Sequence, residues 1–168
     1  MTTDPAVFRN VLGHFATGVT VVTGMDGDDP VGFTCQAFSS LSLDPPLVLI
    51  APARTSTSWP RIAKGGFFCI NVLASGEADT ARHFAVSGGR KFDGLSWSES
   101  RSGSPVLGGV LAYVDCSLEA VHDGGDHVIA VGRVLDLSVA PDPGGPLLFY
   151  RGSFGHFATA PAPQEEDV

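Results

Sequence analysis

The stretch 32–46 combines small, hydroxyl and amide side chains at the end of an apolar run, which suits the binding of a planar ring. Small side chains let a ring lie close to the backbone, whose N–H and C=O groups can bond the polar ring edge. Serine hydroxyls can bond polyol or phosphate oxygens. A polar transition from a strand to a loop, with no ligand, is the alternative. The residues concerned are Phe33, Thr34, Cys35, Gln36 and Ala37, with Ser39 and Ser40 beside them.

A second stretch, 53–60, places an arginine and four hydroxyl residues before a short segment with helical character. Backbone N–H groups at the start of a helix, together with hydroxyl and guanidinium donors, form a good seat for a phosphate group. Capping of the helix by Ser56 or Thr57 is the alternative and needs no ligand. The expected anion-binding residues are Arg54, Thr55, Ser56 and Thr57.

A third stretch, 122–127, forms a tight turn between two apolar segments and contains two histidines and two aspartates. A metal site is not indicated, because the two histidines lack a third convergent ligand in the sequence. A solvated Asp-Gly-Gly turn explains Asp123, Gly124 and Gly125 well. It leaves Asp126 and His127, at the start of the next segment, available to a functional site.

The chain of 168 residues has a formal net charge of −8, which argues against a nucleic-acid or anionic-membrane surface. Against this acidic background the basic pair Arg90 and Lys91, followed by Phe92, can add local positive charge to the same anion. The N-terminal residues lack the pattern of a signal peptide, and no apolar stretch approaches the ~20 residues that span a bilayer. We therefore expect a cytoplasmic protein.

The three cysteines, Cys35, Cys69 and Cys116, lie far apart in apolar surroundings with no Cys-x-x-Cys spacing. Neither a zinc site nor a disulfide framework is indicated. Buried core thiols are the expected state, most clearly for Cys69 and Cys116.

Apolar periodicity predicts a mainly β fold with a few short helices. A helix is expected over 5–15, where Asp4 serves as the N-cap, and two more around 56–64 and 77–86. About seven strands without regular alternation of strand and helix favour one antiparallel barrel over a doubly wound sheet. The acidic, Pro-containing end, 158–168, is expected to be a disordered tail after a single domain spanning 1–157. The strands are expected at 19–23, 31–36, 47–51, 67–73, 110–121, 128–137 and 147–150.

Taken together, these stretches resemble the flavin reductase-like family, whose fold is the FMN-binding split β-barrel. The resemblance covers about residues 8–157 and is to the reductase components of two-component flavin-dependent monooxygenases. Stretches 33–37, 122–127 and 147–152 look most like reductases that serve actinobacterial hydroxylases of phenolic ring-opened steroids. The residues that carry the resemblance are 15–23, 31–38, 43–48, 68–73, 91–94, 125–127 and 147–152.

The resemblance implies a site for FMN or FAD. The flavin ring is expected at Thr34 to Ala37, with Ser39 and Ser40 beside it. The phosphate or ribityl chain is expected at 54–57 and Lys91. Arg90 departs from the family pattern, because an acidic residue is common at that position.

The resemblance also implies a nicotinamide side of the site, where NADH or NADPH serves as the hydride donor. Asp126 and His127 belong to the Gly-Asp-His motif associated with the nicotinamide. The second motif of that side consists of Phe149, Tyr150, Arg151 and Gly152. A homodimer, and a separate oxygenase that receives the reduced flavin, are the expected partners.

The implied chemistry is hydride transfer from nicotinamide to flavin, for which the protein supplies placement and not an acid or base. A non-catalytic flavin carrier or redox module on the same barrel is one alternative, and an oxidase acting on a pyridoxine-type substrate is another. The presence of both nicotinamide-side motifs speaks against a simple carrier.

Overall fold

The computed structural model describes residues 3–141 and 144–159. Most of the predicted tail, residues 160–168, therefore lies outside the described residues. Within the described part of the chain, no helix is long and apolar enough to cross a membrane.

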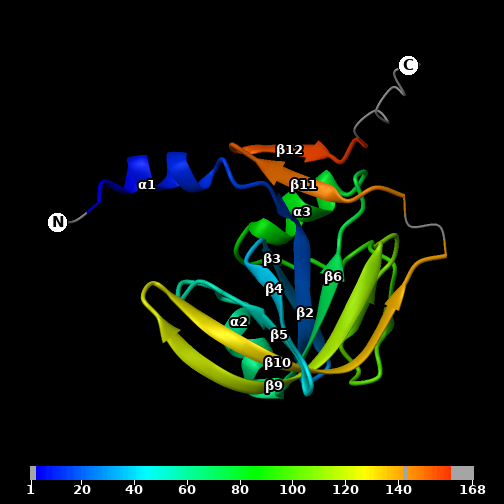
Figure 1. Cartoon of the computed structure of the whole chain (residues 1–168). Coiled ribbons are helices and arrows are strands. Elements are labelled where there is room, and N and C mark those ends of the chain that lie inside the picture. The colour runs from blue at the N-terminus through cyan, green and yellow to red at the C-terminus, as the bar shows by residue number, and fades with distance from the viewer. Residues whose placement is uncertain (1–2, 142–143, 160–168) are drawn as a thin grey trace, which may run out of the picture.

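A seven-stranded antiparallel sheet forms the body of the molecule and curls into a barrel (Figure 1). Its two edge strands are β3 and β4, which follow each other directly in the chain. The predicted antiparallel barrel is confirmed. In spatial order the strands are β3 (Asp29–Cys35), β2 (Thr20–Asp26), β6 (Phe67–Val72), β9 (Ala112–Gly124), β10 (His127–Val139), β5 (Pro46–Ile50) and β4 (Phe38–Leu43).

The remaining elements lie around this barrel. A small sheet of three strands, β1 (Thr17–Gly18), β11 (Leu147–Tyr150) and β12 (Ser153–His156), lies above it in Figure 1. Helix α1 (Pro5–Leu12) extends away from the barrel beside that small sheet. The other elements are α2 (Trp59–Gly65), α3 (Ala78–Ala85) and the hairpin of β7 (Trp97–Glu99) and β8 (Pro105–Leu107).

The local predictions fail mainly where an element is short. Asp4 caps α1 as predicted, because its Oδ1 accepts a hydrogen bond of 2.7 Å from the Ala6 N–H. The helix ends at Leu12 and not at Phe15, since Gly13 takes the C-cap position. Five strands were not predicted, namely β1, β4, β7, β8 and β12. Four of them have only two to four residues, too few to show a period.

The two faces of β2 contact different apolar cores. Val22 points into the barrel, where it joins a cluster that includes Ile50 and Phe68. Val21, one residue earlier, points to the opposite face, as the period of two in a strand requires, and packs in a second cluster with Phe84 of α3. The second core thus fixes α3 and the small sheet to the outside of the barrel.

Gly132 of β10 is required by close packing inside the barrel. A Cβ at this position would lie 2.5 Å from Cζ of Phe68 and 3.0 Å from Cβ of Cys116. Gly132→Ala is therefore expected to lower the free energy of unfolding by about 1–3 kcal/mol, because a packed core resists an added methyl group. Denaturant unfolding measures the loss.

The matched control is Gly155→Ala in β12, where an added Cβ meets no atom within 4 Å. It is expected to leave stability within about 0.5 kcal/mol of the parent. Equal effects of the two substitutions would contradict the packing argument.

Candidate functional site

A cleft of about 520 Å³ opens at the split of the barrel, beside the edge strand β3. It brings together five of the predicted ring-binding residues, three of the predicted anion-binding residues, Lys91 and His127. The lining residues are Phe33, Thr34, Cys35, Gln36, Ala37, Ala51, Pro52, Ala53, Thr55, Ser56, Thr57, Ser58, Phe84, Ala85, Val86, Ser87, Lys91 and His127.

The cleft exists because the sheet does not close on itself between β3 and β4. The chain passes from one sheet edge to the other within Gln36 and Ala37, and the Ala37 carbonyl accepts from the Ala51 N–H at 3.0 Å. β3 therefore has a partner, β2, on one side only. On its other side, alternate N–H and C=O groups face outward, as in any antiparallel edge strand. The polar edge of a planar ring can bond groups of this kind.

One outward carbonyl of this edge, that of Gly32, is already satisfied by protein groups. It accepts hydrogen bonds from Ser58 Oγ at 2.9 Å and from Lys91 Nζ at 3.1 Å. Thr34 lies two residues further on the same edge, so its backbone polar groups face the cleft by the same alternation. Ser58 and Lys91, the two donors to the Gly32 carbonyl, connect α2 and the loop after α3 to β3. These contacts fix two walls of the cleft.

Lys91 is a buried cation at the end of the cleft. Its side chain is mostly enclosed, and Nζ donates to the Gly32 carbonyl and to the Phe84 carbonyl at 2.9 Å. Among the described residues it forms no ion pair with a carboxylate. Burial lowers the pKa of the Lys91 ammonium, because the charged form loses hydration. An ammonium group has three N–H donors, so one donor is left for an anionic ligand.

The hydroxyl segment before α2 is only partly committed to the helix. The Trp59 N–H donates to Ser56 Oγ at 3.1 Å, so the capping alternative holds for Ser56. The Thr55 and Thr57 hydroxyls make no hydrogen bond with a described residue. They line the cleft near Lys91 and can donate to phosphate oxygens.

His127 enters the cleft from the start of β10, held by the turn that precedes it. Its Nδ1 lies 2.8 Å from Asp126 Oδ1, and this hydrogen bond lowers the pKa of the Asp126 carboxyl. The Val128 N–H donates to the Pro52 carbonyl at 3.0 Å, and the Arg54 N–H donates to the Asp126 carbonyl at 2.9 Å. The turn is thus joined to the cleft segment 51–58 by backbone hydrogen bonds.

Arg54 does not line the cleft. Its Nε donates to the Gly125 carbonyl at 2.8 Å, and its guanidinium group pairs with the Asp123 carboxylate. Gly125 lies in the turn between β9 and β10, and Asp123 lies near the end of β9. The structure therefore shows Arg54 bracing the turn that carries His127.

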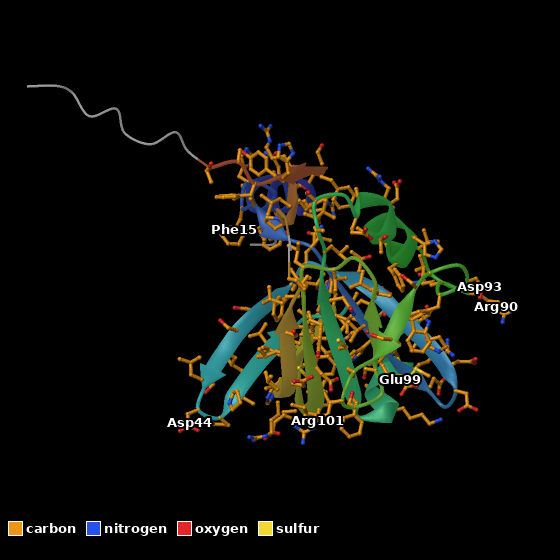
Figure 2. The ribbon with its side chains drawn as sticks, turned by 90° about the vertical axis from the view of Figure 1, so that its right-hand side faces the viewer. Phe15, Asp44, Arg90, Asp93, Glu99 and Arg101 are labelled. Carbon is orange, nitrogen blue, oxygen red and sulfur yellow. The ribbon has the colours of Figure 1, made fainter. Side chains whose placement is uncertain are left out.

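A second, more apolar cavity of about 670 Å³ lies on the other side of Gln36 and Ala37, which line both cavities. Figure 2 shows Phe15, one of its lining residues, near the junction between α1 and the small sheet. Of the second nicotinamide-side motif, Phe149 and Gly152 line this cavity. Its lining residues are Phe8, Arg9, Leu12, Gly13, Phe15, Thr17, Gln36, Ala37, Phe149 and Gly152.

Six other predicted site residues line neither of these two cavities. Ser39 and Ser40 lie in β4, where Ser39 Oγ donates to the Ser40 carbonyl at 3.0 Å. Phe92 packs in the second core, with its ring centroid 5.3 Å from that of Phe84. Asp126 is exposed and contacts the site through His127. The remaining two, Tyr150 and Arg151, lie at the turn between β11 and β12.

The structure adds lining residues that the sequence did not indicate. Ala51, Pro52 and Ala53 follow β5, Phe84 and Ala85 end α3, and residues 86 and 87 follow that helix. They are apolar or small, apart from one serine, and reach the cleft only through tertiary packing. Cys35, which was predicted, lines the cleft as a residue, and burial raises the pKa of its thiol to about 11, so the thiol stays neutral.

The fold and the cleft together define a class of protein: a split β-barrel with a ring-sized cleft at the seam of the sheet. A protein-family model described as "Flavin reductase like domain" matches residues 12–158. The chain therefore belongs to the flavin reductase-like family, which confirms the predicted fold and the predicted class of activity, flavin reduction.

Individual relatives agree with this assignment. The chain is 52% identical, over 98% of its own length and 86% of the relative's, to the reductase subunit HsaB of a flavin-dependent monooxygenase from Rhodococcus jostii. Nitrilotriacetate monooxygenase component B from Mycobacterium thermoresistibile matches with a TM-score of 0.89 and 44% identity, over 96% of this chain and 93% of that one. An NADH:FAD oxidoreductase of Streptomyces globisporus matches with a TM-score of 0.86 and 37% identity, over 95% and 98%.

Proposed function

We propose that this chain is an NAD(P)H-dependent flavin reductase, which reduces FMN or FAD in the cleft and releases the reduced flavin to a separate flavin-dependent monooxygenase. The observation that carries the proposal is the convergence of the predicted ring-binding stretch, the hydroxyl segment, Lys91 and His127 on one cleft of a flavin reductase-family barrel. Relatives named as reductase subunits of monooxygenases support the same reading.

The residues of the chain place and orient the reactants. A flavin bound here supplies the hydride acceptor, so no protein acid or base is required. The outer edge of β3, from Phe33 to Ala37, offers backbone groups to the ring, while Thr55, Thr57 and Lys91 offer donors to the phosphate. The apolar cavity beyond Gln36 and Ala37 offers Phe149 to the nicotinamide. The catalytic contribution of these residues is to bring the reacting atoms of the nicotinamide and the flavin to ~3–3.5 Å from each other.

A turnover assay tests the proposal. We expect the purified chain to oxidise NADH, or NADPH, in the presence of FMN, FAD or riboflavin, with multiple turnovers and release of reduced flavin. A flavin carrier would bind flavin without consuming nicotinamide cofactor. A pyridoxine-type oxidase would turn over its own substrate with oxygen and no nicotinamide. Either result would overturn the proposal.

We further propose that His127 binds the nicotinamide cofactor and that Arg54 positions it through the turn. His127→Ala is expected to lower kcat/KM for NADH by about 3- to 150-fold, because one hydrogen bond to the cofactor is lost. Flavin affinity is expected to change little. Arg54→Ala is expected to cost about 2- to 5-fold on the same parameter, since an exposed ion pair contributes little. Steady-state kinetics with NADH and with each flavin as the varied substrate measure both effects.

The double variant distinguishes this role from direct phosphate binding. If Arg54 acts through His127, adding Arg54→Ala to His127→Ala costs almost nothing further. If Arg54 contacts phosphate, Arg54→Ala raises KM for FMN and FAD but not for riboflavin. Arg133→Ala is the matched control, because Arg133 forms a bidentate pair with Glu119 on the same hairpin and does not line the cleft.

A homodimer is also proposed, because the apolar face of α1 has no cover within the described chain. Val7, Phe8, Val11 and Leu12 are each more than half exposed, and no residue of α1 is buried. A second copy of the chain would bury this face. Sedimentation equilibrium is expected to give twice the chain mass, whereas a monomer with full activity would contradict the proposal.

A cytoplasmic location remains part of the proposal, because the reaction needs a supply of reduced nicotinamide cofactor.

A further inference from the structure

Thr17 carries a buried hydroxyl group that makes no hydrogen bond. In the part of the chain that the structure describes, its Oγ1 is the one buried side-chain nitrogen or oxygen in this state. An unpaired buried hydroxyl destabilises a fold, because the group loses its hydrogen bonds to water and gains none in return. The Thr17 hydroxyl is therefore a candidate for bonding a ligand.

The position of Thr17 indicates where such a ligand lies. Thr17 lines the apolar cavity of about 670 Å³. It belongs to β1, which pairs with β11 so that Thr17 is directly opposite Phe149, another lining residue. Directly opposed side chains share one face of a sheet, with their Cβ atoms about 4.5–5.5 Å apart. Thr17 and Phe149 are therefore neighbours on one wall of the cavity.

The hydroxyl can reach the cavity by rotation of the side chain alone. Thr17 as a whole is half-buried, so its exposed area belongs to atoms other than Oγ1. The hydroxyl and the methyl group share one Cβ, and threonine adopts more than one staggered χ1 rotamer. Rotation breaks no hydrogen bond to a described residue.

Thr17 differs from the other polar side chains of this cavity. These are Arg9 and Gln36, and both residues are exposed. Their polar groups bond water in the absence of a ligand, so a new hydrogen bond replaces an existing one. The Thr17 hydroxyl gives up no such bond. Its preference for a bound ligand is therefore the strongest of the three.

We propose that the Thr17 hydroxyl donates a hydrogen bond to the carboxamide oxygen of the reduced nicotinamide cofactor and thereby orients the nicotinamide ring. The inference rests on the proposed function, in which the nicotinamide lies beside Phe149. The ring nitrogen is bonded to ribose, so the carboxamide on C3 is the polar group at the free edge of the ring. A ring packed on Phe149 brings this group within reach of the residue opposite.

The orientation of the carboxamide determines the position of the hydride. C4, which carries the hydride, is bonded to C3, so a fixed carboxamide also fixes C4. Gln36 and Ala37 line both this cavity and the cleft proposed for the flavin. Holding the carboxamide at Thr17 therefore selects the ring orientation from which C4 can face that cleft.

Thr17→Val removes the hydroxyl and nearly keeps the shape of the side chain. The melting temperature is expected to rise by about 2–4 °C, because an unpaired buried hydroxyl is removed. The kcat/KM for NADH is expected to fall by about 2- to 10-fold, because one neutral hydrogen bond to the cofactor is lost. FMN affinity is expected to stay constant. Thr17→Ser keeps the hydroxyl and is expected to keep the kcat/KM of the parent chain.

Thr23→Val is the matched control, because the same change is made at a hydroxyl that is fully paired. Thr23 Oγ1 donates to the Pro105 carbonyl at 2.5 Å and accepts from Asn71 Nδ2 at 3.0 Å, and Thr23 lines neither cavity. This variant is expected to melt at a lower temperature with unchanged NADH kinetics. A similar loss of stability in Thr17→Val, or unchanged kcat/KM for NADH in that variant, would overturn the inference.

Reduced thionicotinamide adenine dinucleotide identifies the atom that Thr17 contacts. Sulfur replaces the carboxamide oxygen in this analogue and is a much weaker hydrogen-bond acceptor. The ratio of kcat/KM for NADH to kcat/KM for the analogue is expected to be about 2- to 10-fold larger in the parent chain than in Thr17→Val. Equal ratios would overturn the inference. Failure of the parent chain to oxidise NADH with any flavin would instead overturn the proposed function.

Discussion

The site depends on one constraint: β3 and β4 are opposite edges of the same sheet but are separated by only two residues of chain. The sheet must therefore curl until its edges approach, yet β3 and β4 do not pair. The bond from the Ala51 N–H to the Ala37 carbonyl holds the seam on one side. The outer edge of β3 is left facing a cleft. An edge strand is normally a liability in a soluble fold, and here it leaves backbone groups free to bond the planar ring that we propose for the cleft.

The protein groups that satisfy part of this edge also shape the rest of the cleft. Ser58 and Lys91 both donate to the Gly32 carbonyl, so α2 and the loop after α3 are fixed relative to β3 by the same acceptor. Lys91 also donates to the Phe84 carbonyl near the end of α3, where a cation interacts favourably with the helix dipole. Lys91 is thus a fixed positive charge in an acidic chain, with two of its three N–H donors already used by the protein. Such a charge suits a ligand that must bind and then leave.

Much of the fold could be predicted from the sequence because the longer strands are apolar runs bounded by turn residues. Helix α1 could also be predicted, because Asp4 and Pro5 form a local capping pattern at its start. That stretch 33–37 lines the cleft could be anticipated because small and polar residues interrupt an apolar strand there. The elements that the sequence did not predict depend on tertiary structure. β4 looks like a polar loop in the sequence because it contains three serines, and it is a strand because it pairs with β5.

Arg54 shows why residue type alone does not assign a role. An arginine beside four hydroxyl residues is a reasonable phosphate ligand, but its guanidinium group pairs with Asp123, 69 positions away. No local pattern indicates that contact, because the hairpin turn reaches residue 54 only after β5 and β10 have paired.

The central claim is that the seam of the barrel holds the flavin, and a crystal structure of the chain soaked with FMN tests it most directly. We predict that the ring lies against the outer edge of β3 between Phe33 and Ala37, with the phosphate near Thr55, Thr57 and Lys91. A flavin bound in the apolar cavity beside Phe149, with the cleft unoccupied at saturating FMN, would contradict the account.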